Sequence, residues 1–88
     1  MRLKNGIIKT EINGEYFLVD SGTEGVPFNG MIKLNETGAF IVNELKTDTD
    51  ADKIADALCR EYDVSREKAL QDTEGLIAAL EKAKLTVK

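Results

Sequence analysis

The chain has 88 residues, which is enough for one small domain and too few for two. Its 42% hydrophobic and 32% charged residues are typical of a folded globular domain and exclude a disordered tail. The net charge of -4 opposes binding that depends on neutralising phosphates, which disfavours nucleic acid and anionic membranes as partners.

Two strands joined by a tight turn are predicted near the start of the chain. Segments 7–12 and 15–20 flank Asn13-Gly14, the dipeptide that type I′ hairpin turns favour because both positions need a positive φ. With these two residues in the turn, Ile12 lies opposite Glu15. The predicted core face then carries Ile8, Thr10, Ile12, Phe17 and Val19, and the opposite face carries Lys9, Glu11, Tyr16, Leu18 and Asp20.

A short third strand is predicted at residues 31–34, after a loop rich in residues that favour turns. Ile32 and Leu34 share the face of this strand that we expect to point toward the core. Met31 and Lys33 share the other face.

Three helices are predicted in the second half of the chain, each preceded by a polar residue that can cap it. Asn35 is expected to cap the first, which ends near Lys46. The polar run 47–50 supplies the cap of the second, which stops around Asp63, and Ser65 caps the third. The predicted inward stripe of the third helix is Ala69, Leu70, Thr73, Leu76, Ile77, Leu80 and Ala83.

Three strands followed by three helices predict an α+β fold, a single winged helix-turn-helix domain over residues 1–88. Such domains often bind DNA through a basic helix. Here the third helix region, residues 65–84, carries equal numbers of basic and acidic side chains, so its charge argues against DNA. A degenerate DNA-binding domain or a protein-interaction domain stays the alternative function.

Each candidate for chemistry has a simpler structural interpretation. The absence of histidine removes the usual general base and the commonest metal ligand. Glu36 with Glu44, or Asp48 with Asp50, form carboxylate pairs, but acidic residues at helix starts stabilise the helix dipole and this stretch lacks a calcium-loop spacing. Cys59 lies on an apolar helical stripe, where a small buried hydrophobe is the ordinary role. We therefore predict no catalytic residue, no metal site and no cofactor.

The sequence also predicts the compartment. Its longest apolar stretch is far shorter than the about 20 residues that cross a bilayer, and the first ten residues lack the apolar region of a signal peptide. A single cysteine excludes an internal disulfide. A reducing cytoplasm is therefore expected.

Binding of another polypeptide is the remaining function, and the strand at 31–34 is the candidate surface. At the edge of a small sheet, its free amides and carbonyls can pair with an extended peptide while neighbouring side chains supply specificity. The alternative is an ordinary edge that the rest of the chain covers.

A family resemblance lies in the second half of the chain. It is carried by Leu34-Asn35-Glu36-Thr37-Gly38-Ala39-Phe40-Ile41, Ile54-Ala55-Asp56-Ala57-Leu58, Glu61-Tyr62-Asp63-Val64, Glu67 and Asp72. These residues resemble the PqqD family in type and spacing, over about residues 31–83. Its members, also called RiPP recognition elements, are small chaperones for ribosomally made, post-translationally modified peptides, and the name-giving member serves pyrroloquinoline quinone biosynthesis.

The resemblance implies a winged helix-turn-helix that binds a peptide in place of DNA. It implies that the leader of a precursor peptide adds as a strand beside residues 30–34 and packs between that strand and the third helix. Leu70 and Ile77 are explained equally well as core residues. The implied peptide-binding residues are Gly30, Met31, Ile32, Lys33, Leu34, Leu70, Thr73, Glu74 and Ile77.

The resemblance implies no chemistry in the chain itself, because a partner enzyme, commonly a radical SAM enzyme with iron-sulfur clusters, modifies the delivered peptide. One cysteine is too few to hold such a cluster here. Two departures from the family pattern are a longer loop from Ser21 to Asn29 and Lys46-Thr47-Asp48 in place of an Asp-Gly after the first helix. Neither identifies the pathway, so quinone cofactor synthesis is not assigned.

Overall fold

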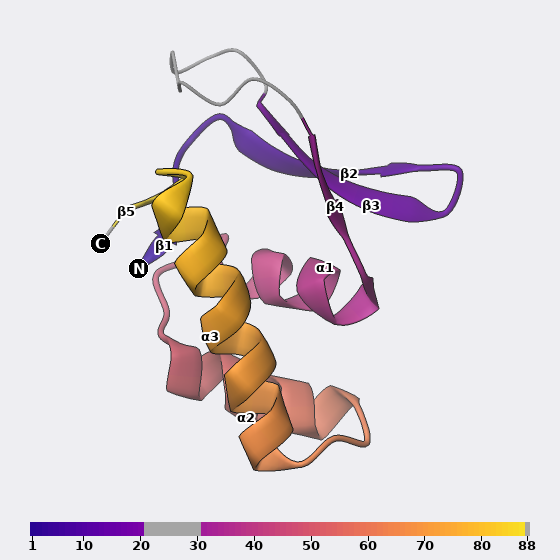
Figure 1. The fold of residues 1–88 in the computed structure, drawn as a ribbon, viewed down its shortest axis with the longest axis vertical. Coiled ribbons are helices and arrows are strands. Elements are labelled where there is room, and N and C mark those ends of the chain that lie inside the picture. The colour runs from indigo at the N-terminus through magenta and orange to yellow at the C-terminus, as the bar shows by residue number, and fades with distance from the viewer. Residues whose placement is uncertain (21–30, 88) are drawn as a thin grey trace.

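The computed structural model describes residues 1–20 and 31–87. The predicted loop at 21–29 and Gly30 lie outside the described residues. An antiparallel sheet in the order β2-β3-β4 lies across one end of the helical part, with α1 directly beneath it (Figure 1). The strands of this sheet are β2 (Ile7–Ile12), β3 (Glu15–Asp20) and β4 (Met31–Leu34), and the helices are α1 (Glu36–Glu44), α2 (Ala51–Glu61) and α3 (Arg66–Lys82). The predicted α+β fold is confirmed, in a winged-helix-like arrangement.

The hairpin between β2 and β3 forms as predicted. Ile12 pairs with Glu15 across the two-residue turn. Asn13 and Gly14 have φ angles of 53° and 82°, both in the left-handed region that a type I′ turn requires. The turn dipeptide therefore sets the register of the whole hairpin.

All three helix caps are also confirmed. The side chains of Asn35, Asp50 and Ser65 each accept a hydrogen bond from the backbone N–H three residues further on, at 2.7, 2.9 and 3.1 Å. Each bond satisfies an amide that the first helical turn leaves without a partner. The polar residues before the helices thus fix where the helices begin.

The predicted faces of the hairpin are wrong, because the structure reverses them. Leu18 is fully buried and Ile7 is buried, whereas Ile8 and Ile12 are 48% and 45% exposed. Both faces of these strands carry apolar residues, and the helices cover the face that bears Leu18. We call the opposite side the outer sheet face; its residues are Ile8, Thr10, Ile12, Glu15, Phe17, Val19, Met31 and Lys33.

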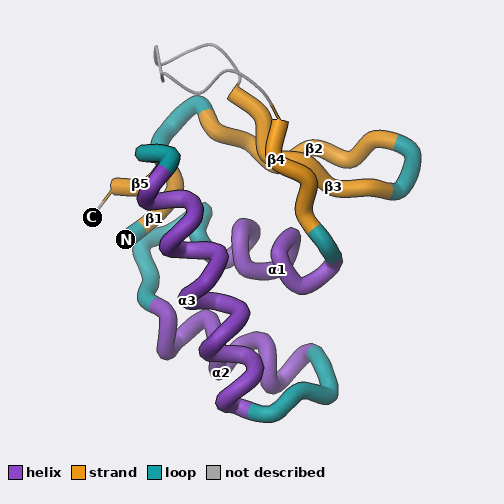
Figure 2. The backbone as a smooth tube through the Cα atoms, viewed as in Figure 1, coloured by secondary structure: helices purple, strands orange, loops and turns teal. Residues whose placement is uncertain are grey.

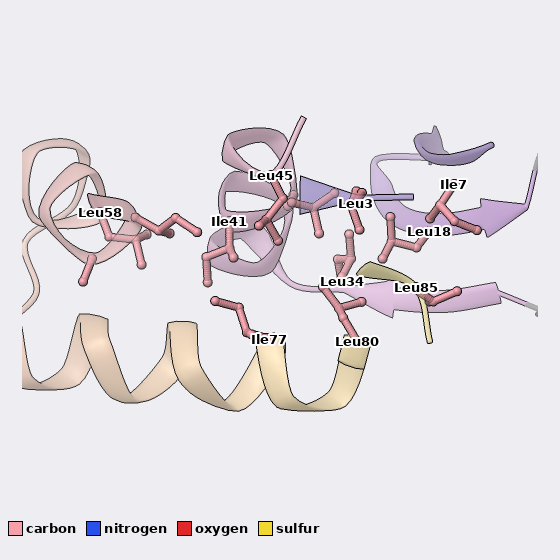
Figure 3. Packing of buried hydrophobic residues seen from close by; sticks show 14 of the residues in the cluster. Leu3, Ile7, Leu18, Leu34, Ile41, Leu45, Leu58, Ile77, Leu80 and Leu85 are labelled. Atoms are coloured by element: carbon pink, nitrogen blue, oxygen red, sulfur yellow. The ribbon is translucent and has the colours of Figure 1, made fainter. Parts of the chain in front are cut away.

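The core lies between the inner sheet face and the three helices (Figure 3). Leu34 at the end of β4 is buried, and Ile32 is half-buried against the same cluster, which confirms the predicted inward side of the third strand. Ile41 on α1 and Leu80 on α3 belong to the same buried cluster as Leu34 (Figure 3). Leu34 therefore anchors the third strand directly above the helical part.

A second, two-stranded sheet was not predicted from the sequence. β1 (Arg2–Leu3) pairs antiparallel with β5 (Thr86–Val87). Figure 2 shows this pair apart from the larger sheet, beside the last turn of α3. Leu3 and its neighbour Leu85 are both buried in the core, so the pair closes the side of the domain where the two ends of the chain meet. No helix among the described residues has the length and apolar character needed to cross a membrane.

Candidate functional site

The candidate site begins at β4, an edge strand of the three-stranded sheet. β4 pairs with β3 on one side, and no described strand pairs with its other side. Tyr16 lies opposite Leu34 and Leu18 lies opposite Ile32 in the β3–β4 register. One row of β4 backbone groups is therefore left for a further strand.

The hairpin register determines which β4 residues point their backbone groups to this open edge. A two-residue turn is closed by a hydrogen-bonded pair, and such pairs recur at every second residue of an antiparallel ladder. Because Ile12 and Glu15 close the turn, the odd-numbered residues of β3 bond to β2 and the even-numbered ones bond to β4. The N–H and C=O groups of Met31 and Lys33 consequently point away from the sheet, to the open edge.

A groove of about 700 Å³ lies beside this edge. The end of β4 and the first turns of α1 form one wall, with the buried side chains of Leu34 and Ile41 at its apolar base. One side of α3 forms the other wall. The α3 residues that line the groove are Lys68, Gln71, Asp72, Gly75, Leu76 and Ala79.

Small residues keep the groove open on the α3 side. A Cβ atom placed on Gly75 would meet no atom within 4 Å, so the space above this glycine is empty. Ala79 follows one helical turn later on the same wall. On the α1 side, a Cβ on Gly38 would approach the capping oxygen of Asn35 to 3.0 Å, which shows how tightly the cap fits this corner.

The charges around the groove are paired with one another. Lys68 binds Asp72 at 2.9 Å on α3, and Lys33, whose side chain points to the outer sheet face, binds Glu15 there at 3.0 Å. These exposed pairs leave no single sign of charge dominant. With apolar side chains at its base and an open strand edge beside it, the groove is suited to an extended, mostly apolar chain segment.

The residues implied by the resemblance divide between strand and helix. Met31 and Lys33 are exposed on the edge strand, Ile32 is half-buried, and Lys33 and Leu34 line the groove. The edge strand thus brings four of the implied residues together. Gly30 lies outside the described residues.

The four helix residues that the resemblance implies do not line this groove, which is lined by a different set of α3 residues. Thr73 and Ile77 are buried in the interior, and Leu70 is half-buried against the core. Glu74 is exposed and lines, with Ile77, a separate hollow near the N-terminal residue. Most of the apolar stripe predicted for α3 packs onto the core. Leu76 belongs to that stripe and also lines the groove, whereas the other α3 residues of the groove wall are small, polar or charged. The signal that sequence reasoning missed is the pair of small residues, Gly75 and Ala79, four positions apart.

Another hollow, of about 260 Å³, lies under the hairpin on the far side of α1. The Lys9 ammonium sits 5.2 Å from the centre of the Tyr16 ring, and the rings of Phe40 and Tyr62 meet edge to face at 5.7 Å. Burial, and then the nearby charge of Glu36, raise the pKa of the Tyr62 hydroxyl. The first contact lies within the hairpin, and the second joins α1 to the end of α2.

Two of the acidic residues considered for chemistry, Asp48 and Asp50, are engaged in structural contacts. Asp50 caps α2, and Asp48 forms an ion pair with the N-terminal ammonium group, which lowers the pKa of that carboxyl. Arg66 at the start of α3 binds Asp56 at 2.8 Å and Asp52 at 3.3 Å on α2, and these contacts raise the pKa of its guanidinium. Over residues 1–20 and 31–87, no group of three or more possible metal ligands comes together.

The chain is similar to known proteins in both sequence and fold. A family model described as "Coenzyme PQQ synthesis protein D (PqqD)" matches residues 15–85. The solved structure "TbiB1 in Complex with the TbiA(beta) Leader Peptide" is 25% identical with a TM-score of 0.73, and the match covers 97% of this chain and 93% of that chain. "Lasso peptide synthetase B1 complexed with the leader peptide" has the same identity and TM-score, with coverage of 99% and 96%. Among curated proteins there is no significant match.

Proposed function

The chain belongs to the PqqD family, and we propose that it is a non-catalytic module that captures the leader of a ribosomally made precursor peptide and presents it to a modifying enzyme. The observation that carries this function is the open edge of β4 beside the groove. Two structurally similar proteins are described as leader-peptide complexes, which supports the same class of ligand here.

Strand addition follows from the direction of the free backbone groups. A leader in extended conformation pairs its amides and carbonyls with those of Met31 and Lys33. Its side chains then alternate between the two faces of the widened sheet. Those on the inner side enter the groove above Leu34, and those on the outer side extend the outer sheet face.

The proposed contact residues combine the edge strand with the groove wall of α3. The proposed contact residues on β4 are Met31, Ile32, Lys33 and Leu34. Gly30 remains a predicted contact residue. On α3 we propose Gly75, Leu76 and Ala79 in place of the four helix residues that the resemblance implied. These three face the groove, whereas Leu70, Thr73, Glu74 and Ile77 do not line it.

The chemistry is proposed to belong to the partner. Around the groove, the charged side chains are paired and the base is apolar, an arrangement that binds an extended chain and offers no activated nucleophile. A radical SAM enzyme in the cytoplasm stays the predicted partner. The structural matches include a lasso peptide synthetase component, so other classes of peptide-modifying enzyme fit the same fold.

DNA binding, the alternative, is disfavoured by the structure of α3. The first two basic side chains of this helix are engaged by carboxylates, Arg66 by Asp52 and Asp56 and Lys68 by Asp72. A helix that reads DNA presents such groups to phosphates and bases. We propose no function in nucleic-acid binding.

The first experiment identifies the peptide. The tagged protein is purified from its native cells, and the bound material is analysed by mass spectrometry that includes peptides of a few kilodaltons. We expect one short ribosomal precursor together with a peptide-modifying enzyme. Recovery of DNA or of a regulatory complex, with no such peptide, contradicts the proposed function.

The second experiment tests the binding mode with the recovered peptide, made synthetically and labelled for fluorescence anisotropy. Lys33→Pro removes an amide that points to the open edge and leaves the bonds between β3 and β4 in place. Its affinity for the peptide should fall about tenfold, as expected for one lost hydrogen bond of about 1–1.5 kcal/mol. Lys33→Ala, the matched control, keeps the amide and should stay within about threefold of the original affinity. Equal affinity of the proline variant and the control contradicts strand addition at β4.

A further inference from the structure

The outer sheet face carries an unusual concentration of exposed apolar side chains. Among the described residues, the large hydrophobic side chains that are exposed are Ile8, Ile12 and Met31, at 48%, 45% and 53%. All three point to the same side of the sheet, although they come from two different strands. Isolated apolar side chains on a surface are ordinary, but a gathering on one face marks an interaction site.

The cross-strand register arranges these side chains in a row. Ile8 lies opposite Val19, and Val19 lies opposite Met31, so an apolar row crosses β2, β3 and β4. Side chains at directly opposite positions of neighbouring strands share a face and touch. The next row is Thr10, Phe17 and Lys33. Both rows end at the open edge of β4.

The charges on this face are balanced. Lys33 and Glu15 both point to it, and they bind each other at 3.0 Å. The face therefore presents an apolar strip next to a neutral ion pair, whereas the surface between α2 and α3 carries the Arg66, Asp52 and Asp56 cluster. A partner for the outer sheet face is expected to be apolar at its centre, with few unpaired charges.

A bound leader continues the same surface. The leader residues that pair with Met31 and Lys33 point their side chains to the outer side, because opposite residues of a ladder share a face. The two rows would then run from β2 across the sheet and onto the peptide without interruption. A protein seated there contacts the module and the peptide together, and it leaves the groove on the inner side undisturbed.

The size of the face favours an enzyme over a second copy of the chain. Three strands of this length cover roughly 20 by 14 Å, or about 300 Å². A stable protein interface buries about 800 Å² on each partner, so this face is too small to hold a dimer by itself. A partner that also binds the leader gains the missing area from the peptide.

We propose that the outer sheet face is the docking surface for the peptide-modifying enzyme, which thereby contacts the module and the outward side chains of the bound leader at once. This inference rests on the proposed function, since it needs a leader at β4. It assigns the two sides of the sheet different partners: the helices on the inner side and the enzyme on the outer side.

The test measures enzyme binding and peptide binding separately. The recovered enzyme is titrated onto the immobilised module with saturating synthetic peptide, and peptide affinity is measured by anisotropy without the enzyme. The variant is Ile8→Glu with Ile12→Glu, both on β2, the strand farthest from the peptide edge. The matched control, Asn43→Glu with Ala78→Glu, adds the same charges at exposed helix positions.

The β2 variant should bind the peptide as tightly as the original protein and bind the enzyme at least tenfold more weakly, while the control keeps both affinities. Ile8→Thr with Ile12→Thr keeps branched side chains suited to a strand, and it should also weaken enzyme binding, by at least threefold. Unchanged enzyme affinity in both β2 variants overturns the inference. A second outcome also overturns it. In that outcome, analytical ultracentrifugation shows that the original protein is a dimer and that the β2 variants are monomers, and the variants bind the enzyme with full affinity. If the original protein fails to bind the peptide at all, the proposed function falls, and this inference falls with it.

Discussion

Leu18 and Ile32 lie opposite each other on β3 and β4, and both point from the inner side of the sheet toward the helices. Leu18 is fully buried and Ile32 is half-buried. Their neighbours in each strand, Val19 and Met31, lie opposite each other on the outer sheet face. The sheet therefore has a structural side and a side that is available to partners.

Replacing a side chain on each side should separate these roles. Leu18→Ala should lower the free energy of unfolding by about 2–4 kcal/mol, because it leaves a cavity in the core. Ile8→Ala, on the outer sheet face, should lower it by less than about 1 kcal/mol. Urea denaturation of the two variants checks this difference. Equal losses would show that the outer face belongs to the core.

The third strand offers a matched pair of charged substitutions. Ile32→Asp should destabilise the fold by at least about 2 kcal/mol, because it places a charge against the apolar cluster. Met31→Asp should leave the melting temperature nearly unchanged, since this side chain is 53% exposed, and should weaken peptide binding. Thermal melting and peptide titration are the measurements. A Met31→Asp protein with full peptide affinity would place the peptide elsewhere.

Because the space above Gly75 is empty, a small side chain there should stabilise the fold, and a large one should weaken peptide binding. Gly75→Ala should raise the free energy of unfolding by up to about 1 kcal/mol, because alanine favours a helix and its Cβ meets no neighbour. Gly75→Leu extends a larger side chain into the groove and should weaken peptide binding by more than tenfold. Ala78→Leu, at an exposed position of the same helix, is the control and should bind the peptide normally. Tight binding by Gly75→Leu would exclude this wall of the groove from the site.

The raised pKa of Tyr62 predicts an alkaline loss of stability. Burial keeps the hydroxyl protonated in the folded state above its ordinary pKa of 10.0. The contribution of the Tyr62 hydroxyl to the free energy of unfolding is therefore complete below about pH 10. It is lost as the pH rises through the folded-state pKa of this group. Tyr62→Phe keeps an aromatic ring beside Phe40 and has no ionisation, so its stability should fall less between pH 9 and pH 11. Urea denaturation across that range is the check, and parallel curves for the two proteins would contradict the assignment.

Local signals in the sequence were sufficient to predict where the hairpin and the three helices lie. Asn13-Gly14 sets the hairpin register through its positive φ angles, and Asn35, Asp50 and Ser65 set the helix starts through side-chain bonds to nearby amides. These interactions act within a few residues, so a single sequence contains them completely. The family pattern in the second half added the class of ligand, which the family match supports.

The sheet faces and the helix wall of the groove were missed because both depend on distant contacts. Apolar residues occupy both faces of the hairpin, and the outer one, with Ile8 and Ile12, is the richer of the two. Alternation therefore favours the wrong face. On α3, the apolar stripe was sufficient to identify the core side, but only the packed structure shows that the adjoining side, with Gly75 and Ala79, borders an open groove.

The pairing of β1 with β5 has a mechanical consequence. Because Arg2 lies opposite Val87 and Leu3 opposite Thr86, a force that pulls the two ends apart loads these pairs one after the other, as a zipper opens, and not all at once. The β1–β5 pair should separate at low force and expose Leu3 and Leu85, while the hairpin and the edge strand β4 stay folded. A single-molecule pulling experiment should then show a small first extension before the main unfolding event.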